Sequence, residues 1–251
     1  MAQGLRDVQI VRSGTACNSA CRFCCQSDLR PLEGERSSDE VFSEIRSASA
    51  RAIVLGGGEV TLRPELVDWV KSAKESGDRT VVVQTNGRML SYRKYARRLV
   101  NAGVDVFRVG VHGHIASLHD WLTRIDGSFE QAIIGMRNVQ SLGALVYVDT
   151  VVTRSNFRHL PDIAKMLPAW GATGVRFTWA RRCTTCPCCL RWANAEGSKI
   201  HHTSSLIPRL EMVAPYLETA TGIARALNRR VSVNLPEEEP IMEAQHGLAA
   251  G

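Results

Sequence analysis

The feature that most constrains the fold is an alternation, along most of the 251 residues, of short apolar runs with segments of helical periodicity. Such alternation favours parallel βαβ units joined by right-handed connections. The strands that it predicts are residues 8–12, 52–55, 80–84, 104–111, 145–152 and 174–179. Apolar stripes at helical spacing lie between them, for example Leu66, Trp69, Val70 and Ala73. Six units make about three quarters of an eight-unit barrel, so the predicted fold is α/β, a partial (β/α)6 TIM-like barrel of parallel strands.

Polar or glycine-rich segments directly follow five of these predicted strands. They are the segment with Cys17, Cys21 and Cys24, then Gly56–Glu59 (residues 56–59), Thr85–Gly87 (85–87), His112-Gly113 and Thr153–Asn156 (153–156). In a parallel α/β sheet, the loops at the carboxyl ends of the strands gather on one rim, where active sites lie. The sequence therefore predicts one functional rim built from all five segments.

The first segment carries three thiols, Cys17, Cys21 and Cys24, in the spacing C-x3-C-x2-C. Cysteine thiolates in short local runs hold iron–sulfur clusters, and three ligands on a [4Fe–4S] cluster leave one iron open to a substrate or cofactor. The alternatives are a zinc knuckle, which needs a nearby fourth ligand, or a set of redox thiols.

These motifs resemble the radical S-adenosylmethionine (SAM) superfamily: the thiol triad with Phe23 before its last cysteine, then Gly57-Gly58-Glu59 and later Thr85-Asn86-Gly87. The segments around His112-Gly113, His119-Asp120, Gly127-Ser128-Phe129 and Val151 to Asn156 are similar to the branch of molybdopterin-cofactor and SPASM-type maturases. The resemblance covers roughly residues 8 to 180.

The resemblance implies that Cys17, Cys21 and Cys24 hold a [4Fe–4S] cluster whose fourth iron binds SAM, and that reductive cleavage yields a 5′-deoxyadenosyl radical. An electron donor of the flavodoxin or ferredoxin type is implied with it. The residues that the family motifs place near SAM are Gly57, Gly58, Glu59, Thr85, Asn86, Phe23 and Thr153. For the glycine-rich and Thr-Asn segments, an ordinary tight strand-to-helix turn remains the alternative.

Polar side chains line one face of the later strands. Candidates for a substrate pocket are Arg108, His112, Tyr147, Asp149 and Arg176, whereas the opposite faces carry valines and aromatic residues. Strands buried on both sides should be apolar throughout, so we expect the polar face to line an open interior. A satisfied structural side chain is the alternative for each residue taken alone.

A second group of thiols follows the last predicted barrel strand: Cys183, Cys186, Cys188 and Cys189. Related families carry auxiliary iron–sulfur clusters at this point, but with ligands dispersed over a longer extension. A second cluster, a zinc ion and no metal all remain open for this group. We expect a barrel domain over residues 1–180, an extension over 181–236 and a disordered tail over 237–251.

Composition narrows the functional classes. The chain lacks a signal-peptide core and an apolar run of the ~18 residues that cross a membrane, which predicts a cytoplasmic protein without a membrane partner. The net charge is +6, but the sequence has no segment in which aromatic residues alternate with basic ones, as is typical of nucleic-acid binding. Nucleic acid is therefore not the expected partner. We expect hydrogen abstraction from a small polar metabolite in natural-product or cofactor biosynthesis. The alternatives are a maturase of a ribosomally synthesised peptide and a zinc or RNA-binding protein without radical chemistry.

Overall fold

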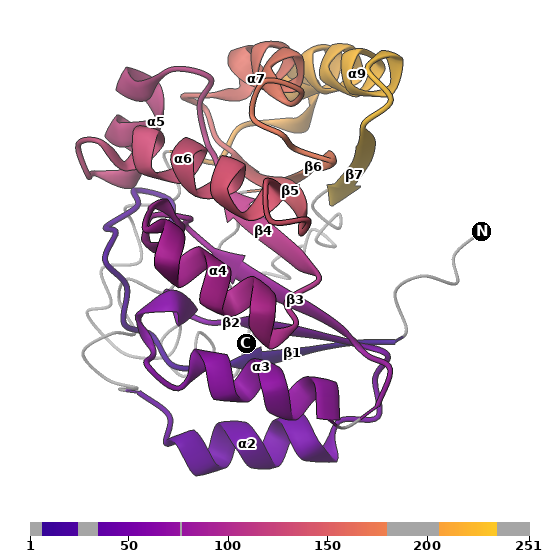
Figure 1. Ribbon diagram of the computed structural model, residues 1–251. Helices are drawn as coiled ribbons and strands as arrows, with labels where there is room; N and C mark the ends of the chain where they lie inside the picture. Colours follow the sequence, from indigo (N-terminus) through magenta and orange to yellow (C-terminus); the bar gives the residue numbers. More distant parts are fainter. Residues whose placement is uncertain (1–6, 25–34, 76, 180–205, 235–251) are drawn as a thin grey trace, which may run out of the picture.

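A single parallel sheet organises the computed structural model, which describes residues 7–24, 35–75, 77–179 and 206–234 (Figure 1). Within these ranges the sheet has seven strands, and their order in space is their order in the chain. The strands are β1 (Val8–Arg12), β2 (Ala52–Gly56), β3 (Thr80–Thr85), β4 (Val106–Gly110), β5 (Leu145–Val152), β6 (Gly174–Trp179) and β7 (Arg230–Asn234).

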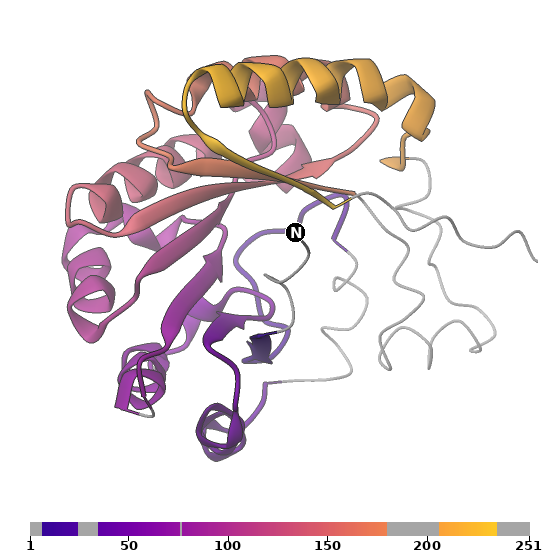
Figure 2. The same cartoon turned by 90° about the vertical axis from the view of Figure 1, so that its right-hand side faces the viewer.

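The helices lie on the convex side of the curved sheet, and the opposite, concave side carries none of those described (Figure 2). They are α2 (Ser38–Ser47), α3 (Leu66–Glu75), α4 (Arg93–Ala102), α5 (Ala116–Thr123), α6 (Ser128–Gln140), α7 (Leu160–Met166) and α9 (Leu210–Ala226). Short 3-10 helices open some connections: η1 (Val60–Leu62), η2 (Met89–Ser91) and η3 (Phe157–His159).

Local signals explain where some helices begin and end. At α2, the Ser37 side chain accepts from the Glu40 N–H and the Glu40 carboxylate accepts from the Ser37 N–H, a reciprocal capping box. At the end of α4, Gly103 adopts φ +111 and donates its N–H to the Leu99 carbonyl. Only glycine takes that left-handed conformation at little cost, so the helix stops there.

The hydrophobic core lies between the sheet and its helices. The stripe of Leu66, Trp69, Val70 and Ala73 is fully buried, as its helical spacing predicts. The sheet residues that meet the helices are also buried: Val109, Val111, Val148, Val152, Val175, Phe177 and Trp179. The prediction that the later strands turn their apolar faces outward, toward the helices, is therefore confirmed.

Strand β4 is shorter than the predicted residues 104–111. Val104 lies in the turn that ends α4, where its N–H donates to the Leu99 carbonyl. The Asp105 carboxylate accepts from the Val81 N–H at 2.7 Å and pairs with Lys74 at 2.6 Å. Both residues are thus engaged in the connection, and pairing with β3 begins at Val106.

The sheet gains one strand beyond the six predicted. Residues 230–234 were not among the six predicted strands, but they form β7, which pairs with β6 in parallel, with Val175 opposite Val231. Helix α9 packs against α7 and makes the crossover to β7. The α/β partial TIM-like barrel is confirmed, with seven strands in place of six.

Some predictions fall outside the described residues. These are the cysteines at 183, 186, 188 and 189 and the tail over 237–251. Among the residues that the structure does describe, no helix combines the length and the apolar character needed to span a bilayer.

Candidate functional site

The three cysteines of the C-x3-C-x2-C motif lie in the loop of residues 13–24 at the carboxyl end of β1. The glycine-rich segment after β2 holds the first part of this loop. Gly58 donates its backbone N–H to the Gly14 carbonyl at 2.9 Å, and Glu59 donates its N–H to the Ala16 carbonyl at 2.7 Å. Ala16, the residue before Cys17, is therefore held in place by a backbone hydrogen bond to the segment that follows β2.

This contact requires glycine. A Cβ atom on Gly58 would lie 2.2 Å from the Ala16 carbonyl oxygen and 2.4 Å from that of Thr15. Both are backbone atoms, which cannot turn aside as a flexible side chain would. Gly57 adopts φ +134, a conformation that other residues rarely take. The two glycines thus let the thiol-bearing loop pack directly on the end of β2.

Helix α5 and its C-terminus hold the other end of the loop. Ala20 donates its N–H to the Thr123 carbonyl at 3.1 Å, and Arg22 donates to the Leu122 carbonyl at 2.9 Å. The Arg22 guanidinium also lies 4.2 Å from the centre of the Trp121 ring, within range of a cation–π interaction. Cys17 and Cys21 lie among these anchored residues, Cys24 lies two residues beyond Arg22, and all three cysteines are partly exposed.

Glu59 ties the ends of β2 and β3 together. Its buried carboxylate accepts from the Thr61 N–H and hydroxyl, from the Thr85 hydroxyl at 2.6 Å, and from the Asn86 N–H at 2.6 Å. Burial raises the pKa of Glu59, and the hydrogen bonds from Asn86 and Thr61 oppose that rise. Two motifs 26 residues apart in the chain, Gly-Gly-Glu and Thr-Asn-Gly, therefore form one hydrogen-bonded unit.

The Thr-Asn-Gly motif also holds the cysteine loop. Asn86 donates its side-chain N–H to the Asn18 Oδ1 at 2.7 Å and to the Ser19 hydroxyl at 3.2 Å. Arg88 donates to the Asn18 carbonyl. The side chains of Thr85 and Asn86, which the family motif places near SAM, are thus engaged within the protein, and contact with SAM remains a prediction for them.

His112 lies where the loop after β4 meets the cysteine loop. Its ring packs edge-on against Phe23, with centroids 4.5 Å apart, and stacks on His119 at 5.6 Å. The His112 Nδ1 accepts from the Val151 N–H at 3.3 Å. Burial lowers the pKa of His112 well below its usual range, so the ring is neutral at neutral pH and carries its proton on Nε2.

Thr153 and Asn156 lock the turn after β5. The Asn156 Oδ1 accepts from the Thr153 N–H at 2.7 Å and from its hydroxyl at 3.0 Å. The Asn156 amide then donates to the His112 carbonyl and the Val151 carbonyl, each at 2.9 Å. Thr153 is fully buried in this network, which joins the loops after β4 and β5, and its contact with SAM stays a prediction.

Three of the five substrate-pocket candidates come together on the polar face of the sheet. Asp149 pairs with Arg108 at 2.8 Å and with Arg176 at 2.6 Å. Burial raises the pKa of Asp149 to about 6, so the carboxyl is still ionised at neutral pH, and the cluster carries one net positive charge. Tyr147 lies opposite Arg108 in the pairing of β4 with β5, but it is not part of the ion-paired triad, and its hydroxyl accepts from Arg230 at 3.3 Å.

Sequence reasoning missed the role of Glu35. Its carboxylate accepts from the N–H of Thr15 at 3.1 Å and of Ala16 at 2.7 Å, and pairs with Arg63 at 3.2 Å. Arg63 in turn donates to the Ser13 carbonyl at 2.7 Å. A single carboxylate far along the chain from its partners leaves no periodic signal, so only the folded structure shows that it supports the cysteine loop.

Residues 11–167 match the family profile described as the Radical SAM superfamily. The chain belongs to the radical SAM superfamily. Its sequence is 34% identical over 173 residues to the mycofactocin maturase MftC of Mycobacterium ulcerans, which covers 66% of this chain and 45% of the relative. It is 30% identical over 155 residues to the Fe-coproporphyrin III synthase of Methanosarcina barkeri, covering 60% of this chain and 38% of that protein.

Solved structures show the same fold. SuiB of Streptococcus suis, crystallised with its precursor peptide SuiA, superposes with a TM-score of 0.68 at 10% identity, over 91% of this chain and 48% of SuiB. This radical SAM protein thus spans about half or less of the length of the relatives that it matches.

Proposed function

We propose that this radical SAM protein binds a [4Fe–4S] cluster through Cys17, Cys21 and Cys24 and acts on a small polar metabolite held on the concave face of its sheet. With SAM at the fourth iron, reductive cleavage there would supply a 5′-deoxyadenosyl radical that takes a hydrogen atom from the substrate. The observation that carries the proposal is the thiol-bearing loop, which is hydrogen-bonded to the protein body before Cys17 and again at Ala20 and Arg22 and whose three cysteines are partly exposed.

The residues present fit such a cluster. Thiolates are the ligands that iron–sulfur clusters take in proteins, and hydrogen bonds to α5 and to the segments after β2 and β3 hold the loop that carries them. Pre-organised ligands lose less conformational entropy on binding than ligands on a free loop. The chain's own contribution is therefore to hold three thiols ready at the rim of the barrel.

For SAM, we propose that the backbone of Gly57 and Gly58 faces the methionyl amino group. The side chains of Glu59, Thr85 and Asn86 hydrogen-bond to one another and to the cysteine loop, so they would fix the position of that backbone. Phe23 and His112 would border the same space from the other side, because their rings touch each other beside the loop.

For the substrate, the Arg108–Asp149–Arg176 triad supports a polar and preferably anionic molecule. Two guanidinium groups share a single carboxylate, so N–H groups that Asp149 does not use remain to bind a ligand. The neutral His112 would add an Nε2–H donor on the same rim. An electron donor of the flavodoxin or ferredoxin type would complete the system.

A peptide maturase is the second candidate. It is supported by the likeness to the maturase MftC and to SuiB, which was crystallised with a precursor peptide. In that case the concave face would hold a peptide side chain. Incubation of reduced, SAM-loaded protein with deuterated candidates distinguishes the two, because deuterium reaches 5′-deoxyadenosine only from the true substrate.

The cluster itself is tested by anaerobic iron and sulfide analysis. We expect Cys17→Ser to lose about four irons per chain. Cys25→Ser is the control and should keep its iron, because Cys25 lies outside the C-x3-C-x2-C motif. Double substitution of Cys183 and Cys186 by alanine tests a second cluster: a fall from about eight irons to about four would establish it. Zinc without iron in the wild-type protein would refute the proposal.

A further inference from the structure

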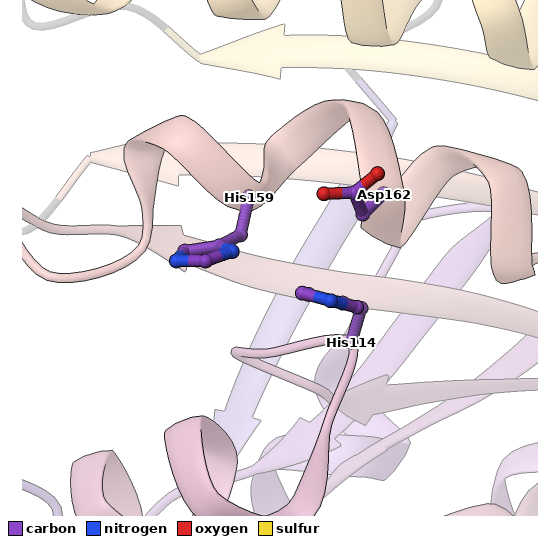
Figure 3. A group of neighbouring side chains, drawn as sticks. All are labelled: His114, His159 and Asp162. Atoms are coloured by element: carbon purple, nitrogen blue, oxygen red, sulfur yellow. The ribbon is translucent and has the colours of Figure 1, made fainter.

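Three side chains of types that bind metal ions lie together beyond the carboxyl ends of β4 and β5. None of them belongs to the cysteine loop. His114 follows β4, His159 ends η3, and Asp162 lies in the first turn of α7. Figure 3 shows the three side chains as neighbours, and the rings of His114 and His159 are stacked with their centroids 5.1 Å apart. Each offers a ligand atom, and these atoms all lie within 4.8 Å of one another.

We propose that His114, His159 and Asp162 bind a divalent transition-metal ion of the zinc type. Imidazole nitrogen suits Zn²⁺, Cu²⁺ and Ni²⁺, whereas Mg²⁺ and Ca²⁺ prefer sets made of oxygen alone. Two imidazoles and one carboxylate give three ligands, which leave the fourth tetrahedral position to water or another small ligand.

An unsatisfied nitrogen supports the site. His114 Nδ1 is buried and has no hydrogen-bond partner among the residues that the structure describes. Buried polar atoms almost always find a partner, and an exception calls for a bound water or ion. A metal ion bound through His114 Nδ1 would give this nitrogen its missing interaction.

The spacing of the ligands fits coordination. His159 and Asp162 are three residues apart at the start of α7, which places both on one side of the helix, as in the Glu-x-x-His pairs of helical metal sites. Zinc bonds of about 2.0–2.1 Å in a tetrahedron separate ligand atoms by roughly 3.4 Å. Binding therefore needs the longest separation to close by at most about 1.4 Å, and it needs the two imidazole rings, now stacked with centroids 5.1 Å apart, to turn until a nitrogen of each points at the ion. His114 lies on a partly exposed loop, which can make this movement.

Neighbouring charges leave the carboxylate available. Lys165 pairs with Asp162 Oδ1 at 2.9 Å, while Oδ2 makes no hydrogen bond to the described residues. Both side chains of that pair are more than a third exposed, so water screens their attraction. The lysine thus does not prevent Asp162 from binding a metal ion.

A bound ion would join two connections of the barrel. It would tie the loop after β4 to the start of α7, and His114 is only two residues from His112, whose ring meets Phe23 of the cysteine loop. The metal site would therefore steady the segment that borders the proposed cluster, without itself taking part in the radical chemistry.

Long-range ¹H–¹⁵N spectra of the imidazole rings in the full chain test the site directly, with Zn²⁺ held at set free concentrations by a chelator. Each histidine gives its own signals, so zinc at cysteine thiols is not mistaken for zinc at this site. We expect added Zn²⁺ to shift the ring signals of two histidines together. One of these two sets of signals should be absent from the spectrum of His114→Gln and the other from that of His159→Gln.

Matched aspartate variants complete the test. Asp162→Asn should weaken zinc binding at least about tenfold. Asp68→Asn should leave it unchanged, although Asp68 forms the same kind of i,i+3 pair with Lys71 in the first turn of α3. Zinc that leaves both ring systems unmoved, or that binds His159→Gln with wild-type affinity, would overturn the proposal.

Discussion

Acidification should destabilise the fold through the buried His119. The His119 Nδ1 accepts a hydrogen bond from the backbone N–H of His112 at 3.1 Å. Burial lowers the pKa of His119 from 6.5 to about 4, and the charge of the nearby Asp120 partly opposes that shift. The unfolded chain binds a proton below pH 6.5, whereas the native ring resists it until about pH 4. Stability from this group is therefore complete above pH 6.5 and is lost as the pH falls toward 4.

The size of the loss follows from the shift. Each pKa unit corresponds to about 1.4 kcal/mol, so His119 should cost about 2 kcal/mol of unfolding free energy by pH 5 and about 3 kcal/mol once the pH falls below 4. Burial lowers the pKa of His112 as well, so this ring adds to the loss in the same direction.

Urea unfolding at pH 7 and pH 5 measures the effect in wild type and in His119→Gln. The glutamine amide oxygen can still accept the His112 N–H, but it does not titrate. We expect the variant to lose about 2 kcal/mol less than wild type between the two pH values. Equal losses, or a His119 ring signal that titrates near pH 6.5, would refute the reasoning.

Three substitutions test the packing of the site. Gly58→Ala puts a methyl group 2.2 Å from the Ala16 carbonyl oxygen, so we expect about 3 kcal/mol of destabilisation in urea and poor iron retention. Gly222→Ala in α9, with open space around it, is the control and should be as stable as wild type or up to about 1 kcal/mol more stable, because alanine has the higher helix propensity. In Glu59→Gln, the side-chain NH2 group would face the backbone N–H of Asn86, which donates to the Glu59 carboxylate in the wild-type protein. We expect thermal melting to show a loss of about 1–3 kcal/mol of unfolding free energy. Asp149→Asn leaves two guanidinium groups without their counter-charge and should cost about 3 kcal/mol by urea unfolding; an unchanged midpoint would show that the triad is not coupled.

Apolar pattern predicted most of the sheet. The bounds of β1, β5 and β6 agree with the predicted residues 8–12, 145–152 and 174–179, because their segments rich in β-branched and aromatic residues end at polar or glycine-rich segments. Strand β7 was underestimated, since its alternation of exposed and half-buried residues is typical of an edge and gives no sign of its partner. Pairing with β6 depends on the packing of α9, which is a tertiary effect.

The site was predictable in position but not in its bonding. Strand ends at a common rim follow from topology, so the cysteine loop, Glu59 and Asn86 were expected to meet. That Glu59 accepts from Thr85 across the strand ends, and that Glu35 holds the cysteine loop, depends on distances that sequence spacing does not encode. The metal-ligating group of His114 and its partners left no motif for the same reason.

The order of the strands has a consequence for biosynthesis. Each strand pairs only with its neighbours in the chain, and the described anchors of the cysteine loop come from residues no later than Thr123. Chains emerge from the ribosome N-terminus first. Every described anchor of the loop therefore leaves the ribosome before the strands that carry Asp149 and Arg176 do.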